Sequence, residues 1–157
     1  MWEIIALMAV CTALGSSGSV FVIHSREDWY EFLKKPSFTP PDWLFTPVWM
    51  ALYMLMGLAM GLVLQAGLHT PGVRTAAYIF SAQMLLNMLW SPIFFGLQKL
   101  GAALAELILL WIAIALTIFF FAQVSALAAW LLVPYIIWVT VSVRLNYEIW
   151  RLNRNGI

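Results

Sequence analysis

The sequence predicts an all-α integral membrane protein: a five-transmembrane-helix bundle that forms one domain over residues 1–157. Of the 157 residues, 64% are hydrophobic and only 10% are charged, and the mean hydropathy is +0.91. A soluble domain of this size needs more polar surface to cover its core. Lipid cannot satisfy free backbone N–H and C=O groups, and the apolar runs are far longer than barrel strands. The spanning structure should therefore be helical.

Five apolar runs are long enough to cross a bilayer, because a spanning helix takes about 20 mostly apolar residues. The first carries Glu3 and no preceding Lys or Arg, which argues against a cleaved signal peptide. Only the connection over residues 24–42 is long, so consecutive helices should be antiparallel neighbours. The expected spans are about 2–23, 43–65, 73–95, 102–122 and 130–150, with Trp2, Trp43, Trp130 and Trp150 as interfacial anchors at their ends.

The distribution of positive charge predicts the orientation. Seven of the eight Lys and Arg residues fall on the side of the long loop and the C-terminus, and Arg74 is alone on the other. The positive-inside rule then places the C-terminus in the cytoplasm and the N-terminus outside. The seven are Arg26, Lys34, Lys35, Lys99, Arg144, Arg151 and Arg154.

The same composition argues against several kinds of partner. No Lys/Arg cluster is dense enough to follow a phosphate backbone, so no nucleic acid is expected. Cys11 is the single cysteine, and the two histidines, His24 and His69, lie in separate loops. Neither a disulfide framework nor a metal site is expected.

Polar and aromatic residues follow one face of the third span. Gln83, Asn87, Trp90 and Phe94 are spaced so that a helix stacks them on a single side. Two amides inside a membrane helix should not face lipid. They either form interhelical hydrogen bonds or point into a ligand cavity.

Two further spans carry stripes of the same kind: Trp49, Tyr53 and Met56 in the second, and Trp138, Ser142 and Leu145 in the fifth. Core packing explains any one stripe. Three stripes of aromatic rings with a few hydrogen-bonding groups suit a flat, mostly apolar ligand.

The first span has two possible packing partners, and the loop after it has two possible roles. Cys11, Gly15 and Ser19 form a small-residue face that permits close approach either to another helix of the bundle or to a second subunit. In the loop, Trp29 precedes a proline-rich stretch that includes Pro40 and Pro41. Such a stiffened aromatic loop is either a lid over the bundle or an interfacial loop whose rings rest among headgroups.

The charged residues of the last two spans permit several pairings. Arg144 and Glu148 are four residues apart, so an ion pair between them is expected, with Arg144 extending outward. Glu106 is either an interface residue or a partner for Arg144. Leu145, Tyr147 and Arg151 match the loose pattern proposed for cholesterol contact, which many helix ends would match by chance.

Several of these segments together resemble the translocator protein or tryptophan-rich sensory protein family (TspO/MBR, the peripheral benzodiazepine receptor family). The matching residues are Trp29, KPSFTPPDW at 35–43, Trp49 to Tyr53, QMLLNMLWSPIFF at 83–95 and VPYIIWVTVSVRLNYEIWRLN at 133–153. They run through most of the chain, in order and at the right span positions.

The resemblance implies a five-helix bundle, usually a homodimer, that binds porphyrins such as protoporphyrin IX and haem, as well as sterols and benzodiazepine-type ligands. No obligatory cofactor is implied. Carried over by motif position, Trp49, Asn87 and Trp138 match family pocket residues, with Trp43, Tyr53, Trp90, Phe94 and Ser142 alongside and Gln83 on the same stripe. Ser142 stands where the family usually has alanine, and Arg144 where it has a small or uncharged residue.

We therefore expect a membrane sensor or regulator that binds a tetrapyrrole. One alternative is an enzyme that degrades porphyrin in light and oxygen, with Trp49 and Trp138 as the photochemical indoles. The other is a porphyrin or sterol transporter. The host membrane is expected to be a bacterial cell membrane, with the mitochondrial outer membrane as the alternative.

Overall fold

The computed structural model describes residues 2–18 and 29–154, and the regular secondary structure of these residues is all helical, with no strand. Four helical stretches are long and apolar enough to cross a membrane: Asp42–Gln65, Val73–Gly96, Leu100–Val124 and Ala126–Asn153. The protein is an integral membrane protein. The elements are α1 (Trp2–Ser16), the 3-10 turn η1 (Tyr30–Phe32), α3 (Asp42–Gln65), α4 (Val73–Ser91), the π-helical turn η2 (Pro92–Gly96), α5 (Leu100–Val124), α6 (Ala126–Leu131) and α7 (Val133–Asn153).

The helix α1 has 15 residues and is shorter than the expected first span. Residues 19–23, with which that span was predicted to end, lie outside the described residues. A fifth crossing of the membrane therefore stays a prediction.

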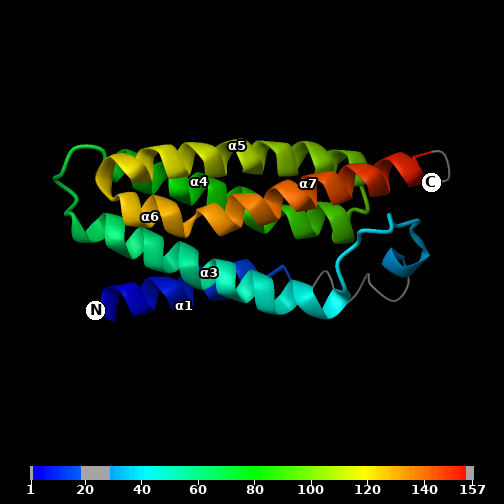
Figure 1. Cartoon of the computed structure of the whole chain (residues 1–157), viewed down its shortest axis with the longest axis horizontal. Helices are drawn as coiled ribbons and strands as arrows, with labels where there is room; N and C mark the ends of the chain where they lie inside the picture. The colour runs from blue at the N-terminus through cyan, green and yellow to red at the C-terminus, as the bar shows by residue number, and fades with distance from the viewer. Residues whose placement is uncertain (1, 19–28, 155–157) are drawn as a thin grey trace.

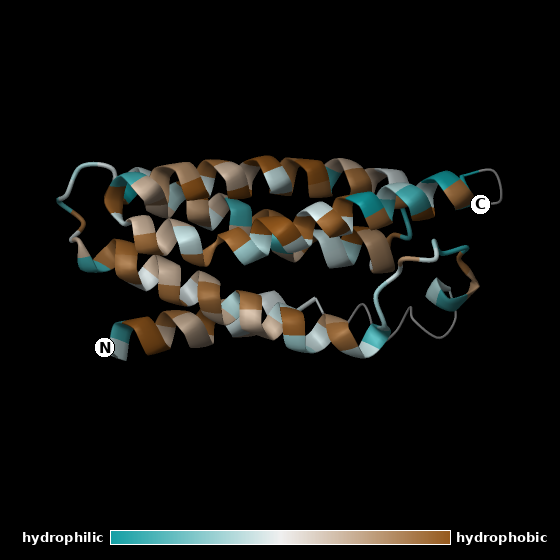
Figure 2. Cartoon of the chain, viewed as in Figure 1, coloured by the Kyte–Doolittle hydropathy of each residue, from teal (hydrophilic) through white to brown (hydrophobic). Residues whose placement is uncertain are grey.

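Long helices run side by side in alternating directions (Figure 1), as the short connections predict. α1 packs on α3, and α4 and α7 both pack on α5. The loop between α4 and α5, the segment after residue 28 and the C-terminus share one end of the bundle (Figure 1). Hydrophobic residues dominate the middle of the helices, and hydrophilic residues gather toward that shared end (Figure 2).

Local sequence explains where the last helices break. Residues 123–129 were expected to form a connection, but α5 continues to Val124 and α6 starts at Ala126. This expectation was wrong because Ser125 makes the whole turn: its extended backbone ends α5, and its Oγ accepts the Ala128 N–H at 3.3 Å, as an N-cap does. α6 and α7 are divided at Leu132, before Pro134, which lacks an N–H to donate.

Glycines permit the close packing of α1 on α3. A Cβ atom at Gly57 would collide with the backbone of Met8, and one at Gly61 would lie 2.8 Å from Cγ1 of Ile4. Gly57 and Gly61 are four residues apart, the small-xxx-small spacing that lets membrane helices approach. Neither glycine was among the residues predicted to permit close helix approach.

The small face of α1 is used inside the bundle. A Cβ at Gly15 would collide with the ring of Tyr53, and Cys11 is 3% exposed. Between the two alternatives for this face, the structure selects contact with another helix of the same chain for Cys11 and Gly15. Ser19 lies outside the described residues.

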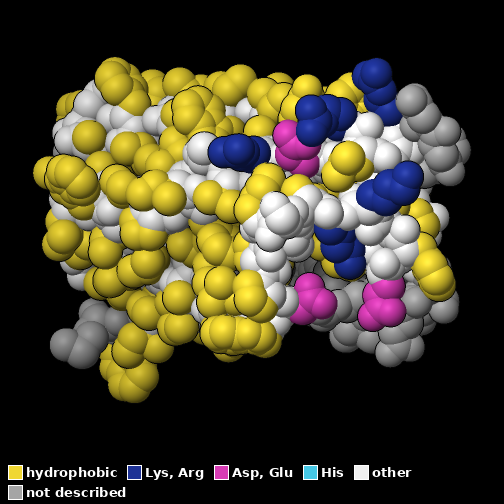
Figure 3. All heavy atoms as spheres, turned by 45° about the vertical axis from the view of Figure 1, so that its right-hand side comes forward, with side chains coloured by type: hydrophobic (Ala, Val, Ile, Leu, Met, Phe, Trp, Pro, Cys, Tyr) yellow, Lys and Arg dark blue, Asp and Glu magenta, His cyan; other side chains and the backbone are white. Residues whose placement is uncertain are grey.

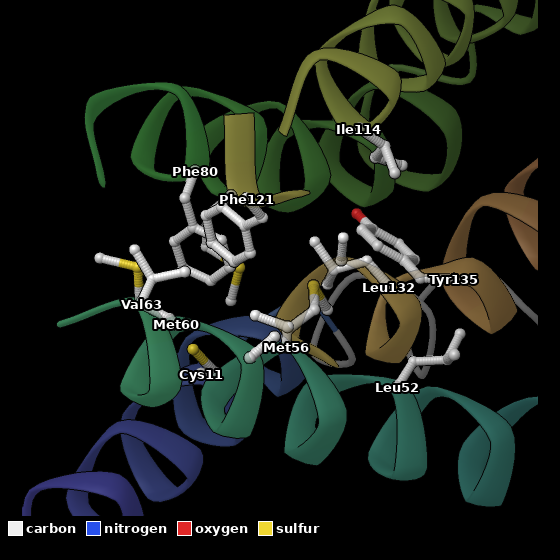
Figure 4. Close-up of a cluster of buried hydrophobic side chains, with 14 of the residues drawn as sticks. Cys11, Leu52, Met56, Met60, Val63, Phe80, Ile114, Phe121, Leu132 and Tyr135 are labelled. Carbon is white, nitrogen blue, oxygen red and sulfur yellow. The ribbon is translucent and has the colours of Figure 1, made fainter. Parts of the chain in front are cut away.

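The main hydrophobic core lies between α1, α3, α4, α5 and α7 (Figure 4). Phe80 of α4 stacks on Phe121 of α5 with ring centroids 5.8 Å apart. Met56, which the sequence places on the stripe of the second span, is fully buried in this core beside Leu132 and Tyr135 (Figure 4). The core closes one half of the bundle, and the other half contains a cavity.

Candidate ligand site

A cavity of about 410 Å³ lies between the helices at the end of the bundle that holds the C-terminus. Residues of α1, α3, α4, α5 and α7 line it, together with Tyr30 of η1 and Phe94 and Phe95 of η2. Its volume falls in the usual range for small-molecule pockets, which is roughly 300–1,000 Å³.

Two pairs of stacked rings form much of its wall. Trp49 and Tyr53 of α3 stack with centroids 5.5 Å apart and an interplanar angle of 28°. Trp90 of α4 and Phe94 of η2 stack at 5.0 Å, also at 28°. The π-helical turn that begins at Pro92 buries Phe94 and the adjacent Phe95 together, although an α-helix would turn neighbouring residues apart. Flat apolar faces are therefore offered by two helices.

The polar part of the wall is a hydrogen-bonded chain across three helices. The Tyr53 hydroxyl donates to Oδ1 of Asn87 at 3.1 Å, and Nδ2 of Asn87 donates to the Tyr135 hydroxyl at 2.8 Å. Tyr135 donates in turn to Oε1 of Gln83 at 3.1 Å. An amide has two N–H donors and two oxygen lone pairs, so Asn87 keeps one of each for another partner. Asn87 therefore both forms interhelical hydrogen bonds and lies in the cavity wall, so the two alternatives do not exclude each other.

The structure brings together six of the nine predicted ligand-binding residues. Trp49, Tyr53, Asn87, Trp90, Phe94 and Ser142 all line the cavity. The other three, Trp43, Gln83 and Trp138, are not among its lining residues.

Each of these three has a different environment. Trp43 is 73% exposed near the start of α3. Gln83 is buried one turn before Asn87 and supports the hydrogen-bonded chain from behind. Trp138 packs edge to face on Phe45 with centroids 5.7 Å apart, and its buried Nε1 has no hydrogen-bond partner within residues 2–18 and 29–154. Helical spacing placed Trp138 on the same side as Ser142, but Trp138 packs on Phe45, and it is Phe45 that lines the cavity.

Asn146 also lines the cavity, although it was not among the predicted site residues. With its amide turned to satisfy both groups, its oxygen accepts from Nε1 of Trp90 at 3.2 Å and its nitrogen donates to the Leu100 carbonyl at 3.1 Å. It thus holds the Trp90 ring in place from α7. Asn146 is four residues after Ser142, and this helical spacing could have indicated that both lie on the same face. The Ser142 hydroxyl itself donates to the Trp138 carbonyl at 2.9 Å, within its own helix.

We call residues 29–41 the lid segment, because part of it covers the cavity. Trp29 packs edge to face on Phe94 at 5.7 Å, and Tyr30 packs on Phe95 at 5.5 Å. Tyr30 and Leu33 are each 8% exposed, so these aromatic and apolar side chains face the protein. The structure therefore favours a lid for residues 29–33. The two prolines lie farther along, Pro40 half-buried and Pro41 exposed at the N-cap of α3.

The expected ion pair between Arg144 and Glu148 was wrong. Glu148 pairs instead with Arg151, with 2.7 Å between Oε2 and Nη2. The Arg144 guanidinium lies over the Phe38 ring of the lid segment, 5.1 Å from its centroid. Both arginines are about one helical turn from Glu148, but the folded lid segment offers Arg144 an aromatic face, which leaves Glu148 to Arg151.

Glu106 is buried in α5 and is 7% exposed. Neither of its carboxylate oxygens has a hydrogen-bond partner among the described residues. The alternative in which it pairs with Arg144 is therefore excluded.

The residues of the cholesterol pattern do not share one surface. Leu145 is buried and lines the cavity, whereas Tyr147 is 44% exposed and Arg151 lies on the exposed face with its partner Glu148. Residues two and six positions after Leu145 fall on the far side of a helix, at 100° per residue.

Basic side chains gather at the end of the bundle where the cavity lies (Figure 3). Lys34 and Lys35 of the lid segment, Lys99 before α5 and the arginines of α7 all belong to this end, while Arg74 is at the opposite one. Arg26 lies outside the described residues. The charge asymmetry that the sequence predicts is thus present in the fold.

The sequence is similar to those of known proteins over most of its length. The sequence pattern of the TspO/MBR family matches residues 7–151. The tryptophan-rich protein TspO of Chlorobaculum tepidum is 44% identical over 93% of this chain and 92% of its own length. The tryptophan-rich sensory protein of Cereibacter sphaeroides is 37% identical, over 96% and 91%. The translocator protein of Homo sapiens is 42% identical, over 87% and 81%. The chain belongs to the TspO/MBR family.

Proposed function

We propose that this protein is a membrane sensor or regulator whose cavity binds a tetrapyrrole such as protoporphyrin IX or haem. The observation that carries the proposal is the cavity wall, in which the stacked pairs Trp49–Tyr53 and Trp90–Phe94 flank the Asn87 amide. Aromatic faces stack on a flat macrocycle, and an amide with a free donor and a free acceptor can orient it.

A ligand comparison on the purified protein tests the class of ligand. Protoporphyrin IX, haem and cholesterol are added separately, and the thermal midpoint is measured for each. A ligand that binds the folded state stabilises it by about 2.7 kcal/mol at one hundred times its Kd. We expect the two tetrapyrroles to raise the midpoint more than cholesterol, because the cholesterol pattern residues lie on opposite sides of α7. Stabilisation by cholesterol alone would contradict the proposal.

Trp49→Ala should lower the affinity for protoporphyrin IX by roughly five- to tenfold, since a stacked aromatic pair is worth about 0.5–1.5 kcal/mol beyond its buried area. Quenching of the remaining tryptophan fluorescence measures the affinity. Trp130→Ala is the control, because Trp130 is 71% exposed and lies on α6, away from the cavity. Equal affinities for the two variants would contradict the placement of the ligand against Trp49.

A second candidate function is degradation of the bound porphyrin in light and oxygen. It is favoured by a cluster of oxidisable rings at the cavity, where Trp49 stacks on Tyr53 and meets Tyr135 edge to face at 6.3 Å. Illumination of the complex under oxygen separates the two functions. A binder leaves the decay rate of the pigment unchanged, and a degrading protein accelerates it in a way that Trp49→Phe reduces.

Membrane placement and assembly are part of the same proposal. We infer that the basic end, with the lid segment and the C-terminus, faces the cytoplasm of a bacterial cell and that the chain forms a homodimer. The charge asymmetry supports the orientation. Because Cys11 and Gly15 pack inside the bundle, a dimer interface would use another surface. Cysteine labelling from each side of the membrane and the mass of the detergent-solubilised protein test the two statements.

A further inference from the structure

The end of α7 is joined to the lid segment by a pair of hydrogen bonds to one side chain. The Lys34 N–H donates to Oδ1 of Asn153 at 3.0 Å, and Nδ2 of Asn153 donates back to the Lys34 carbonyl at 3.0 Å. Nδ2 also donates to the Ile149 carbonyl at 2.7 Å, which holds the amide plane in position. Asn153 is 9% exposed and lies 119 residues from Lys34 in the sequence.

This contact is made at the part of the lid that covers the cavity. Leu33, next to Lys34, packs in a cluster with Tyr30, Phe94, Phe95 and Ile149. Tyr30 lines the cavity directly, and Nζ of Lys35 lies 4.0 Å from the centroid of its ring. A side chain that fixes Lys34 therefore also restrains its neighbours: Leu33, which packs in the cluster, and Lys35, which contacts Tyr30.

Where the contacts of the lid segment with the helices are described on both sides, the ring contacts and the Arg144–Phe38 contact are less directional. Ring contacts and apolar packing tolerate sliding, and the Arg144–Phe38 contact involves two exposed side chains. Two hydrogen bonds to one backbone unit tolerate little displacement, because hydrogen bonds weaken steeply as distance and angle change. Asn153 thus provides a geometric restraint on this segment.

We propose that Asn153 is a latch: a positioning residue that holds the lid segment over the cavity and whose release sets how fast a ligand enters and leaves. The kinetic part rests on the proposed function; the latch itself does not. Loss of the latch raises the population of the open lid in the free and the ligand-bound protein alike. Association and dissociation rates then rise by the same factor, and Kd stays the same.

The first experiment needs no ligand. Leu33→Cys in a Cys11→Ser background places a single thiol on the buried side of the lid segment. Its reaction with a water-soluble maleimide reports how often the lid segment opens. We expect Asn153→Ala to accelerate labelling about tenfold, which corresponds to about 1.4 kcal/mol, within the range for two hydrogen bonds. Arg154→Ala, in the same turn but with its guanidinium over Trp150, is the matched control and should leave the rate unchanged.

A second pair of variants acts from the lid and does not touch α7. Lys34→Pro removes the N–H that donates to Asn153, whereas Lys34→Ala removes only the exposed side chain. Leu33 already has φ −69° and ψ 139°, the conformation that a residue before proline requires. We expect faster labelling with Lys34→Pro, wild-type labelling with Lys34→Ala, and no further increase when Lys34→Pro is added to Asn153→Ala.

The rates for protoporphyrin IX, measured by stopped-flow fluorescence, complete the test. Asn153→Ala should raise the association and dissociation rates by a common factor, with Kd within about twofold of the wild type. A higher Kd from a distorted site would overturn the latch, as would unchanged labelling in both Asn153→Ala and Lys34→Pro. Accelerated labelling without any binding of protoporphyrin IX by the wild type would support the latch and overturn the proposed function instead.

Discussion

Asn87→Leu should lower the affinity for protoporphyrin IX by about ten- to a hundredfold. The substitution keeps a side chain of similar size in the cavity wall but removes its donor and its acceptor. The Tyr53 hydroxyl then loses its acceptor, and Tyr135 loses the hydrogen bond that it receives. Those two losses lower stability in the free and bound protein alike, whereas a polar group of the ligand that bonds the amide is left unsatisfied only in the complex. Such a group costs about 1–3 kcal/mol, and each 1.4 kcal/mol corresponds to a tenfold change in affinity.

Two control variants separate ligand contact from loss of packing. Ser142→Ala changes another residue of the cavity wall, but its hydroxyl is bonded to the Trp138 carbonyl of its own helix, so affinity should change little. Gln83→Leu breaks the same hydrogen-bonded chain behind the wall, so it should lower the thermal midpoint with a smaller effect on binding. Affinity is measured by fluorescence titration. Equal losses of affinity in Asn87→Leu and Gln83→Leu would mean that Asn87 acts through the scaffold alone.

Gly57→Leu should have the largest effect on stability. Any side chain at this position meets the Met8 backbone, and backbone cannot move aside as a flexible side chain does. Overpacking typically costs about 1–3 kcal/mol. At the upper limit, the thermal midpoint should fall by roughly 6–12 °C, taking 2–4 °C per kcal/mol for a chain of this size.

The single cysteine provides a built-in probe for this prediction. Cys11 lies on α1 and is 3% exposed, so separation of α1 from α3 should expose its thiol to a dye that fluoresces on reaction. Ala51→Leu is the matched control, because Ala51 is an exposed residue of the same helix. If Cys11 in Gly57→Leu is labelled as slowly as in the wild type, the packing of α1 on α3 through this glycine is contradicted.

The positions of the long helices could be predicted because hydropathy acts locally. A run of about 20 apolar residues is compatible with lipid only as a helix, whatever its neighbours are. α3 and α5 accordingly begin and end within two residues of the spans expected at 43–65 and 102–122. A connection was expected at 123–129, but its reduction to Ser125 alone was not, since a single residue in extended conformation leaves no mark on a hydropathy window.

The candidate site could be predicted in part for the same reason. Helical spacing identifies residues that share a face, so Asn87, Trp90 and Phe94 were correctly grouped on one side of a helix. Spacing does not say which part of that side is filled by another helix. Trp138 shares its face with Ser142, yet it packs on Phe45, which lines the cavity where Trp138 does not. Asn153 carried no signal, because its partner is a backbone unit 119 residues away.

The sequence by itself determined that this protein is a helical membrane protein with its basic residues at one end and aromatic stripes on three helices. These properties follow from the partition of each side chain between lipid and water and from the helical repeat. Only the tertiary structure decided that α1 packs its small face on α3, that Arg151 and not Arg144 pairs with Glu148, and that Asn153 holds the lid segment. Each of these depends on the distance between residues of different elements or on competition among several partners, and helical spacing specifies neither.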